Sequence, residues 1–205
     1  LKDGDTLIFT LPNMQEMLKR NYTNCLNFEH TYFVTEPYIE HLMTRYGFRI
    51  LEKQYFMDEH SIFYAAVRDS KQPEMPLPKD LYEKNKKLFL SFVSDHEKMI
   101  ADYNNRLQEV EAPIFLFGAH VFAQFLIQMG LDLNNVISIL DNDVRKQGKR
   151  LYGTSMMVDA PAVLAGLKNP IVILKAGIYN QEISEDILNN INPTDDIAIP
   201  IPKKR

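Results

Sequence analysis

The chain lacks tryptophan and has one cysteine, Cys25, among its 205 residues. A single cysteine excludes an intramolecular disulfide framework and a cysteine-based zinc site, and it fits a reducing cytoplasm. No apolar run approaches the roughly 20 residues that span a bilayer, and no signal peptide is visible. The net charge of −4 argues against binding nucleic acid through bulk electrostatics. We therefore expect a cytoplasmic globular protein with no metal, nucleic-acid or membrane partner.

The first region, residues 1–70, predicts a few strands and two helices. A β-rich run follows a turn signal at Asp3-Gly4, and proline stands in the first turn of one helix. The expected elements are a strand from Thr6 to Leu11, a helix from Met14 to Arg20, a helix beginning at Thr35-Glu36-Pro37 and ending at Gly47, and two antiparallel strands, Phe48 to Phe56 and Ser61 to Val67, around Asp58-Glu59.

The second region, residues 71–111, opens with a stiff linker that contains three prolines. No glycine or proline then occurs from Lys79 to Glu111, and apolar residues recur at intervals of three and four. This pattern predicts one amphipathic helix of about 30 residues, roughly 45 Å long, that connects two domains. His96 lies on its apolar stripe, so we interpret it as a core histidine.

The third region, residues 112–205, alternates strands with helices. The expected strands are Ile114 to Phe117, Val136 to Leu140, Ile171 to Leu174 and Ile197 to Ile199, and the expected helices are Val121 to Met129, Ala160 to Leu167 and Gln181 to Asn190. Strands separated by helices of this length imply right-handed parallel crossovers. The predicted fold class is therefore α/β, with a small Rossmann-like parallel sheet in this region.

Polar residues follow three of these strands, where parallel sheets bind ligands. They are Gly118, Ala119 and His120; Asp141, Asn142 and Asp143; and the segment from Lys175 to Asn180, which includes Tyr179. The glycine pattern that cradles a dinucleotide is incomplete after Gly118, so a looser nucleotide or sugar site fits better than tight NAD binding. The alternative is that Asp141 and Asn142 only cap a turn.

Four basic residues follow Asp143 within the segment 142–153, and they are Arg145, Lys146, Lys149 and Arg150. Such side chains suit a diphosphate. They equally suit a solvated loop, which is the commoner role of a charged segment.

Near the start of the chain, Glu29 and His30 stand side by side before a helix. An ordinary imidazole has a pKa of about 6.5, which suits proton transfer at neutral pH, and a neighbouring carboxylate can orient it. The alternative is an incidental histidine in a surface loop. Asn27 and Tyr32 flank the pair and are candidate substrate contacts.

These motifs resemble those of sugar C-methyltransferases, which are class I methyltransferases that use S-adenosylmethionine. Residues 1–13 resemble a late strand of the catalytic domain with the pattern L-K-P-G-G-x-L-I-F-x-x-P-N. Residues 28–33 resemble the signature E-H-x-x-Y/F-F, and residues 141–153 resemble the C-terminal pattern D-x-N-x-x-K-Q-G-K/R-x-x-x-G. The strands after Gly47 match the antiparallel end of the catalytic sheet. The family often has tyrosine where this chain has Asn27.

The resemblance implies a C-methylation of a nucleotide-linked keto sugar, with His30 as general base and Glu29 as its partner. It divides the chain into the end of the catalytic domain (1–70), a linker with a long helix (71–111) and a Rossmann-like C-terminal domain (112–205). That domain would help to hold the nucleotide-sugar. Its candidate contacts are Gly118, His120, Asp141, Asn142, Lys146, Lys149, Tyr179 and Asn180.

The resemblance also implies that the S-adenosylmethionine pocket lies mostly upstream of Leu1. We therefore expect this chain alone neither to bind the cofactor nor to methylate. An open sheet edge at Thr6 to Leu11, or the long helix, would then favour a homodimer. The main alternative is a non-catalytic module that binds nucleotide-sugars.

Overall fold

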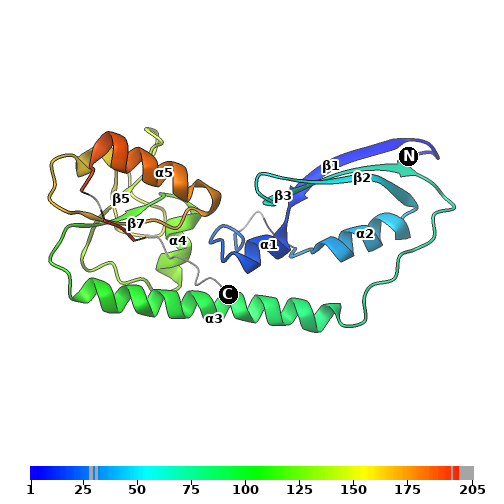
Figure 1. Ribbon diagram of the computed structural model, residues 1–205, viewed down its shortest axis with the longest axis horizontal. Helices are drawn as coiled ribbons and strands as arrows, with labels where there is room; N and C mark the ends of the chain where they lie inside the picture. The colour runs from blue at the N-terminus through cyan, green and yellow to red at the C-terminus, as the bar shows by residue number, and fades with distance from the viewer. Residues whose placement is uncertain (28–29, 31, 195, 199–205) are drawn as a thin grey trace. The chain divides into compact units, whose positions relative to one another are not determined.

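The computed structural model describes residues 1–27, 30, 32–194 and 196–198. Their contacts divide the chain into two units. Unit 1 comprises residues 1–21 and 28–93, and unit 2 comprises residues 22–27 and 94–205 (Figure 1). The short segment 22–27 therefore belongs to unit 2, although both of its flanks in the sequence belong to unit 1.

Unit 1 is built on a three-stranded antiparallel sheet with the order β1-β3-β2. Its elements are β1 (Thr6–Pro12), α1 (Met14–Lys19), α2 (Glu36–Arg45), β2 (Phe48–Phe56) and β3 (Ser61–Arg68). The last strand in the sequence, β3, lies between the other two and is antiparallel to both. The antiparallel hairpin that the sequence predicts is confirmed.

Helix α2 covers one face of this sheet (Figure 1). Proline stands in its first turn, and Ile39 and Met43 pack against Ile62 and Tyr64 of β3. On the opposite face Ile8 of β1 is 62% exposed, and no described element of unit 1 covers it. Strand β1 pairs only with β3 among the described strands. The dimer through this edge stays a prediction.

Unit 2 is built on a five-stranded sheet, all parallel, with the order β6-β5-β4-β7-β8. Its elements are β4 (Ile114–Phe117), α4 (Val121–Gln128), β5 (Val136–Leu140), β6 (Val158–Asp159), β7 (Ile171–Ile173), α5 (Asn180–Asp186) and β8 (Asp196–Ala198). All four residues of β4 are buried, as expected for a central strand covered on both faces. The α/β class is therefore observed, and the parallel sheet has one strand, β6, more than the sequence predicts.

The long helix α3 (Leu81–Gln108) confirms the amphipathic pattern, although it begins and ends a few residues inside the predicted range. The boundary between the two units falls within it, between Val93 and Ser94. His96 is buried, with its ring 4.8 Å from that of Phe125 in an edge-to-face arrangement. No described helix is long and apolar enough to cross a membrane.

The helix predicted from Ala160 to Leu167 is wrong. The structure has only a 3-10 helix, Pro161–Leu164, because the backbone becomes extended at Ala165 and left-handed at Gly166. A glycine at a positive φ ends helices readily, since it has no Cβ to clash. Helix α5 ends in a π-helical turn, Ile187–Ile191, whose Ile187 packs into the core of unit 2.

Candidate functional site

The carboxyl ends of β4 and β5 meet through the side chain of Asp141. This carboxylate is 8% exposed, and its Oδ2 accepts a hydrogen bond from the backbone N–H of Ala119 at 2.8 Å. The same oxygen lies 2.9 Å from Nζ of Lys146, and Oδ1 accepts from the N–H of Asp143. These contacts are those of a residue that caps a turn, which is the alternative role that the sequence leaves open for Asp141. Both oxygens are engaged within the protein.

The loop after β5 is ordered by further hydrogen bonds. Gln147 donates from Nε2 to the carbonyl of Asp141 at 2.9 Å. Arg145 forms a two-point ion pair with Asp143, and hydrogen bonds from Arg145 lower the pKa of Asp143 to about 2. Within the part of the chain that the structure describes, Lys149 and Arg150 have no ion pair. These two cations are the loop's uncompensated charges.

A depression of ≈ 220 Å³ lies between this loop and the start of α4. It is lined by Ala119, His120, Gln124, Arg145, Lys146, Lys149, Arg150, Leu151, Tyr152 and Val158. Four of these side chains carry a guanidinium or ammonium group, and His120 adds an imidazole. The depression therefore suits an anionic group such as a diphosphate.

The structure brings His120, Lys146 and Lys149 together at this depression, but other candidates lie elsewhere. Asn142 is exposed and does not line it. Tyr179 and Asn180 follow β7, and the side-chain carbonyl of Asn180 accepts from the N–H of Ala176 at 2.6 Å. Gly118 contributes a turn with φ of +99° rather than a contact to the depression. The sequence did not single out Gln124 or Tyr152.

Asp141→Ala should destabilise unit 2 by about 3 kcal/mol, because it leaves the Ala119 N–H buried without an acceptor and removes a buried charge partner of Lys146. Urea denaturation followed by circular dichroism measures the change. The control Glu182→Ala alters a carboxylate on the exposed side of α5 and should change stability little. An Asp141→Ala protein as stable as the control would show that the turn does not depend on this carboxylate.

In unit 1 the structure describes His30, whereas Glu29 lies outside the described residues. His30 is half-buried, and its charge acts on a second histidine, His60. Burial lowers the pKa of His60, and the charges of His30 and Arg20 lower it further. The sequence alone does not indicate His60, because this residue lies thirty positions after His30 and no local motif links the two.

His60 follows a strained turn between β2 and β3. Met57, Asp58 and Glu59 have φ of 53°, 53° and 61°, which is the left-handed region that L-residues other than glycine rarely enter. Arg20 holds this turn through the carbonyl and carboxylate of Asp58, at 2.8 and 2.6 Å. Such strain concentrates at functional sites.

This turn lies at the carboxyl end of β1. The N–H of Asn13, directly after β1, donates to the carbonyl of His60 at 2.8 Å, and Nδ1 of His60 lies 2.8 Å from the hydroxyl of Ser61. The flanking candidates are less well placed. Asn27 belongs to unit 2 and donates to the carbonyl of Asn24, and Tyr32 is 81% exposed.

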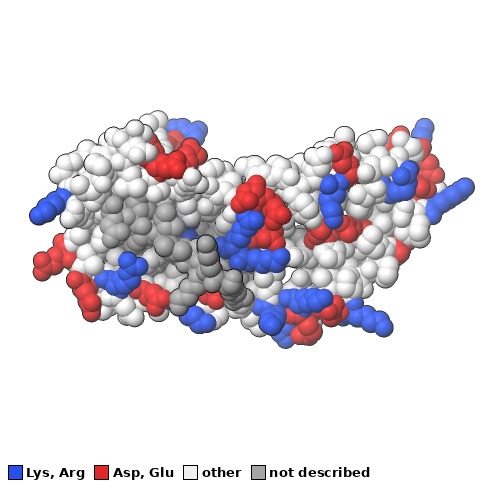
Figure 2. All heavy atoms as spheres, in the orientation of Figure 1, with Lys and Arg blue, Asp and Glu red and all other residues white. Residues whose placement is uncertain are grey.

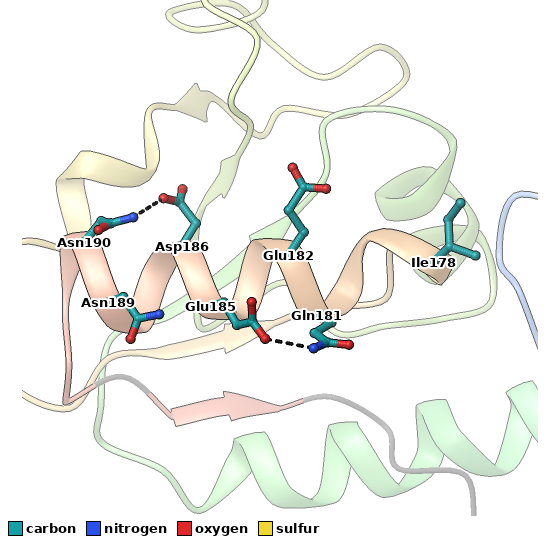
Figure 3. Close-up of a pocket in the computed structure, with 7 residues that line it drawn as sticks. All are labelled: Ile178, Gln181, Glu182, Glu185, Asp186, Asn189 and Asn190. Carbon is teal, nitrogen blue, oxygen red and sulfur yellow. Dashed lines mark hydrogen bonds between the residues drawn. The ribbon is translucent and has the colours of Figure 1, made fainter. Parts of the chain in front are cut away.

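A second depression, of ≈ 520 Å³, runs along α5 and the turn after it. Glu182 and Asp186 extend from one side of the helix, whereas Gln181 and Glu185 extend from another (Figure 3). Gln181 bonds Glu185 and Asn190 bonds Asp186, both at 2.8 Å. Because the carboxylates do not converge, we do not interpret this open surface as a site.

Among the described residues, no group of histidine, cysteine, aspartate and glutamate side chains could hold a metal ion. On the face that Figure 2 shows, the Lys and Arg side chains lie in small groups beside Asp and Glu, with no continuous basic surface among the described atoms. No protein-family model matches the chain, and a search of curated proteins finds no match.

Proposed function

We propose that the chain is the C-terminal part of an S-adenosylmethionine-dependent methyltransferase that adds a carbon-bound methyl group to a nucleotide-linked keto sugar. The strand order of unit 1 carries the proposal. The resemblance implies an antiparallel end of the catalytic sheet, formed by two strands after Gly47, and the antiparallel β1-β3-β2 sheet supports it. The parallel sheet of unit 2 then corresponds to the C-terminal domain.

His30 is the proposed base. It would take a proton from the carbon next to the keto group, and the electrons of the broken C–H bond would form an enolate. An imidazole suits this step because it accepts protons at neutral pH. The position of His60 at the same end of the sheet supplies a second imidazole near the first.

The turn after β4 is a poor fit for S-adenosylmethionine. The Gly118 turn is followed by the bulky His120 and Phe122, and the carboxylate of Asp141 is occupied by internal hydrogen bonds. The proposal therefore places the methyl donor in a part of the enzyme that the resemblance puts upstream of Leu1. This chain would contribute the base and the contacts to the substrate.

The basic depression of unit 2 is the proposed contact for the diphosphate of the substrate. Titration of UDP-glucose into the chain, measured by calorimetry, should show binding that the double variant Lys149→Met/Arg150→Met weakens at least about tenfold, since two uncompensated cations are lost. Lys168→Met removes an exposed cation outside the depression and should leave binding unchanged. Equal binding by both variants would contradict this assignment.

A second candidate function is a non-catalytic module that binds nucleotide-sugars. It is favoured by the separate core of unit 2, in which Phe115, Leu140, Leu164 and Leu174 are buried together. A complete parallel sheet with its own core can bind a ligand at its carboxyl edge without help from a catalytic domain. A Gly-x-Gly-x-Gly strand and loop encoded upstream of Leu1 would favour the methyltransferase, and its absence would favour the module.

A further inference from the structure

Lys175 follows β7 at the carboxyl edge of the unit 2 sheet and is only 7% exposed. Its backbone carbonyl accepts a hydrogen bond from the hydroxyl of Thr23 at 3.0 Å, so the segment 22–27 covers it. No oxygen of the described residues accepts a hydrogen bond from its ammonium group. Burying an ammonium group without a hydrogen-bond partner destabilises the folded state, because no protein contact replaces the lost hydration.

Among the residues that the structure describes, no carboxylate acts on the charge of Lys175. Burial lowers the pKa of Lys175 to about 8, and Cys25 is the single described group whose charge would act on it. Cys25 is fully buried, and burial raises the pKa of its thiol to about 12. At neutral pH the thiol is therefore uncharged, whereas the lysine remains largely protonated.

A second polar group, in the segment 22–27 that contacts this turn, has no partner among the described residues. Oδ1 of Asn24 is buried and has no hydrogen bond within the described residues. It lies 3.9 Å from the position that a Cβ would occupy at Gly177, which has φ of +61°. The turn from Lys175 to Gly177 thus supplies a cationic donor, and the segment 22–27 beside it supplies an acceptor; neither group has a hydrogen-bond partner among the described residues.

We propose that this turn is a phosphate-binding site for an oxyanion that retains a P–O–H group. The charged oxygens would pair with Lys175, and the P–O–H would donate to Oδ1 of Asn24. Inorganic phosphate meets both requirements at neutral pH, and so does a protonated phosphate monoester. Sulfate meets only the first, because it carries no hydrogen to donate. The site is separate from the basic depression after β5 and does not depend on methyl transfer.

The test follows the amide resonances of Thr23 and Gly177 while inorganic phosphate is titrated into the whole 205-residue chain. Both resonances should shift and saturate. In Lys175→Met the apparent affinity should fall at least about tenfold, and in Lys168→Met it should be unchanged, since Lys168 is an exposed cation outside both sites. Saturation at the same concentration in Lys175→Met would overturn the proposal. A parallel titration with glucose 1-phosphate establishes whether an ester or the free ion binds more tightly.

Asn24→Leu provides an independent variant that retains the charge of Lys175. Wild-type protein should bind phosphate more tightly than sulfate, and Asn24→Leu should lose this preference. Affinity in the wild type should also fall as the pH rises through about 8, because the ammonium loses its proton. A preference for phosphate that survives Asn24→Leu, or equal binding of sulfate by the wild type, would overturn the role of Asn24.

Discussion

Lys175→Met should stabilise unit 2 by about 3 kcal/mol at pH 7, a change as large as the one expected from Asp141→Ala but of the opposite sign. Burial lowers the pKa of this lysine from 10.5 to about 8. This difference between the pKa of the unfolded and the folded lysine corresponds to about 3 kcal/mol. It is the free energy by which the protonated ammonium destabilises the folded state. Methionine has a similar length and removes the charge, so the surrounding packing remains filled.

The same difference between the folded and the unfolded pKa of Lys175 determines how stability depends on pH. Above about pH 8 folded Lys175 releases its proton, whereas the unfolded lysine keeps its own up to 10.5. The unfolded state then binds more protons, so stability rises with pH. Cys25 acts in the opposite direction, because its pKa rises from 9.0 to about 12 on folding and the unfolded thiol ionises first. The wild type should therefore gain stability between about pH 8 and 9.

Urea denaturation at pH 7, 8 and 9 measures the change in stability and its dependence on pH. Hydrogen exchange of the β7 amides reports on unit 2 in particular. Lys175→Met should be more stable than the wild type at pH 7 and should lack the gain up to pH 9. Lys168→Met, an exposed lysine in the same unit, should behave as the wild type does. A destabilised Lys175→Met protein would show that the ammonium has a favourable partner in the folded state.

Periodicity predicted the elements of both units because their packing is regular. The continuous apolar run Ile114–Phe117 is buried on both faces of a parallel sheet, and the three- and four-residue spacing of α3 matches an amphipathic helix. Strand β6 was missed because two residues carry no periodic signal. The predicted helix at 160–167 failed because Gly166 ends it early.

The candidate site was less predictable, because its contacts join distant segments. Thr23 and Lys175 are separated by 152 positions, and nothing in the segment 22–27 indicates that it contacts the turn after β7. The sequence places Lys175 in a polar segment after a strand, but it does not indicate that the side chain is buried. Similarly, Arg20 and the turn before His60 meet only after β1 and β3 pair.

His30→Ala should have the largest effect on activity. In the enzyme that carries the cofactor-binding part, we expect methyl transfer to fall by about 10²–10⁴-fold, the usual contribution of a general base. Binding of S-adenosylmethionine should be unchanged, because His30 is proposed to take a proton from the substrate and not to contact the cofactor. The control His41→Asn alters a histidine of α2 whose Nδ1 lies 2.7 Å from the carbonyl of Met75, and an amide can replace that donor. Unchanged turnover in His30→Ala would remove this residue from the role of base.

The pKa of His60, measured without any turnover, tests whether His30 and His60 act on each other. The charge of His30 contributes to the lowered pKa of His60. In His30→Ala the pKa of His60 should therefore rise toward its ordinary value but not reach it, because burial and Arg20 still disfavour its charged form. NMR titration of the His60 imidazole measures this shift in the chain by itself. If the pKa of His60 does not move, the imidazoles are too far apart to share a proton, and His30 would act without His60.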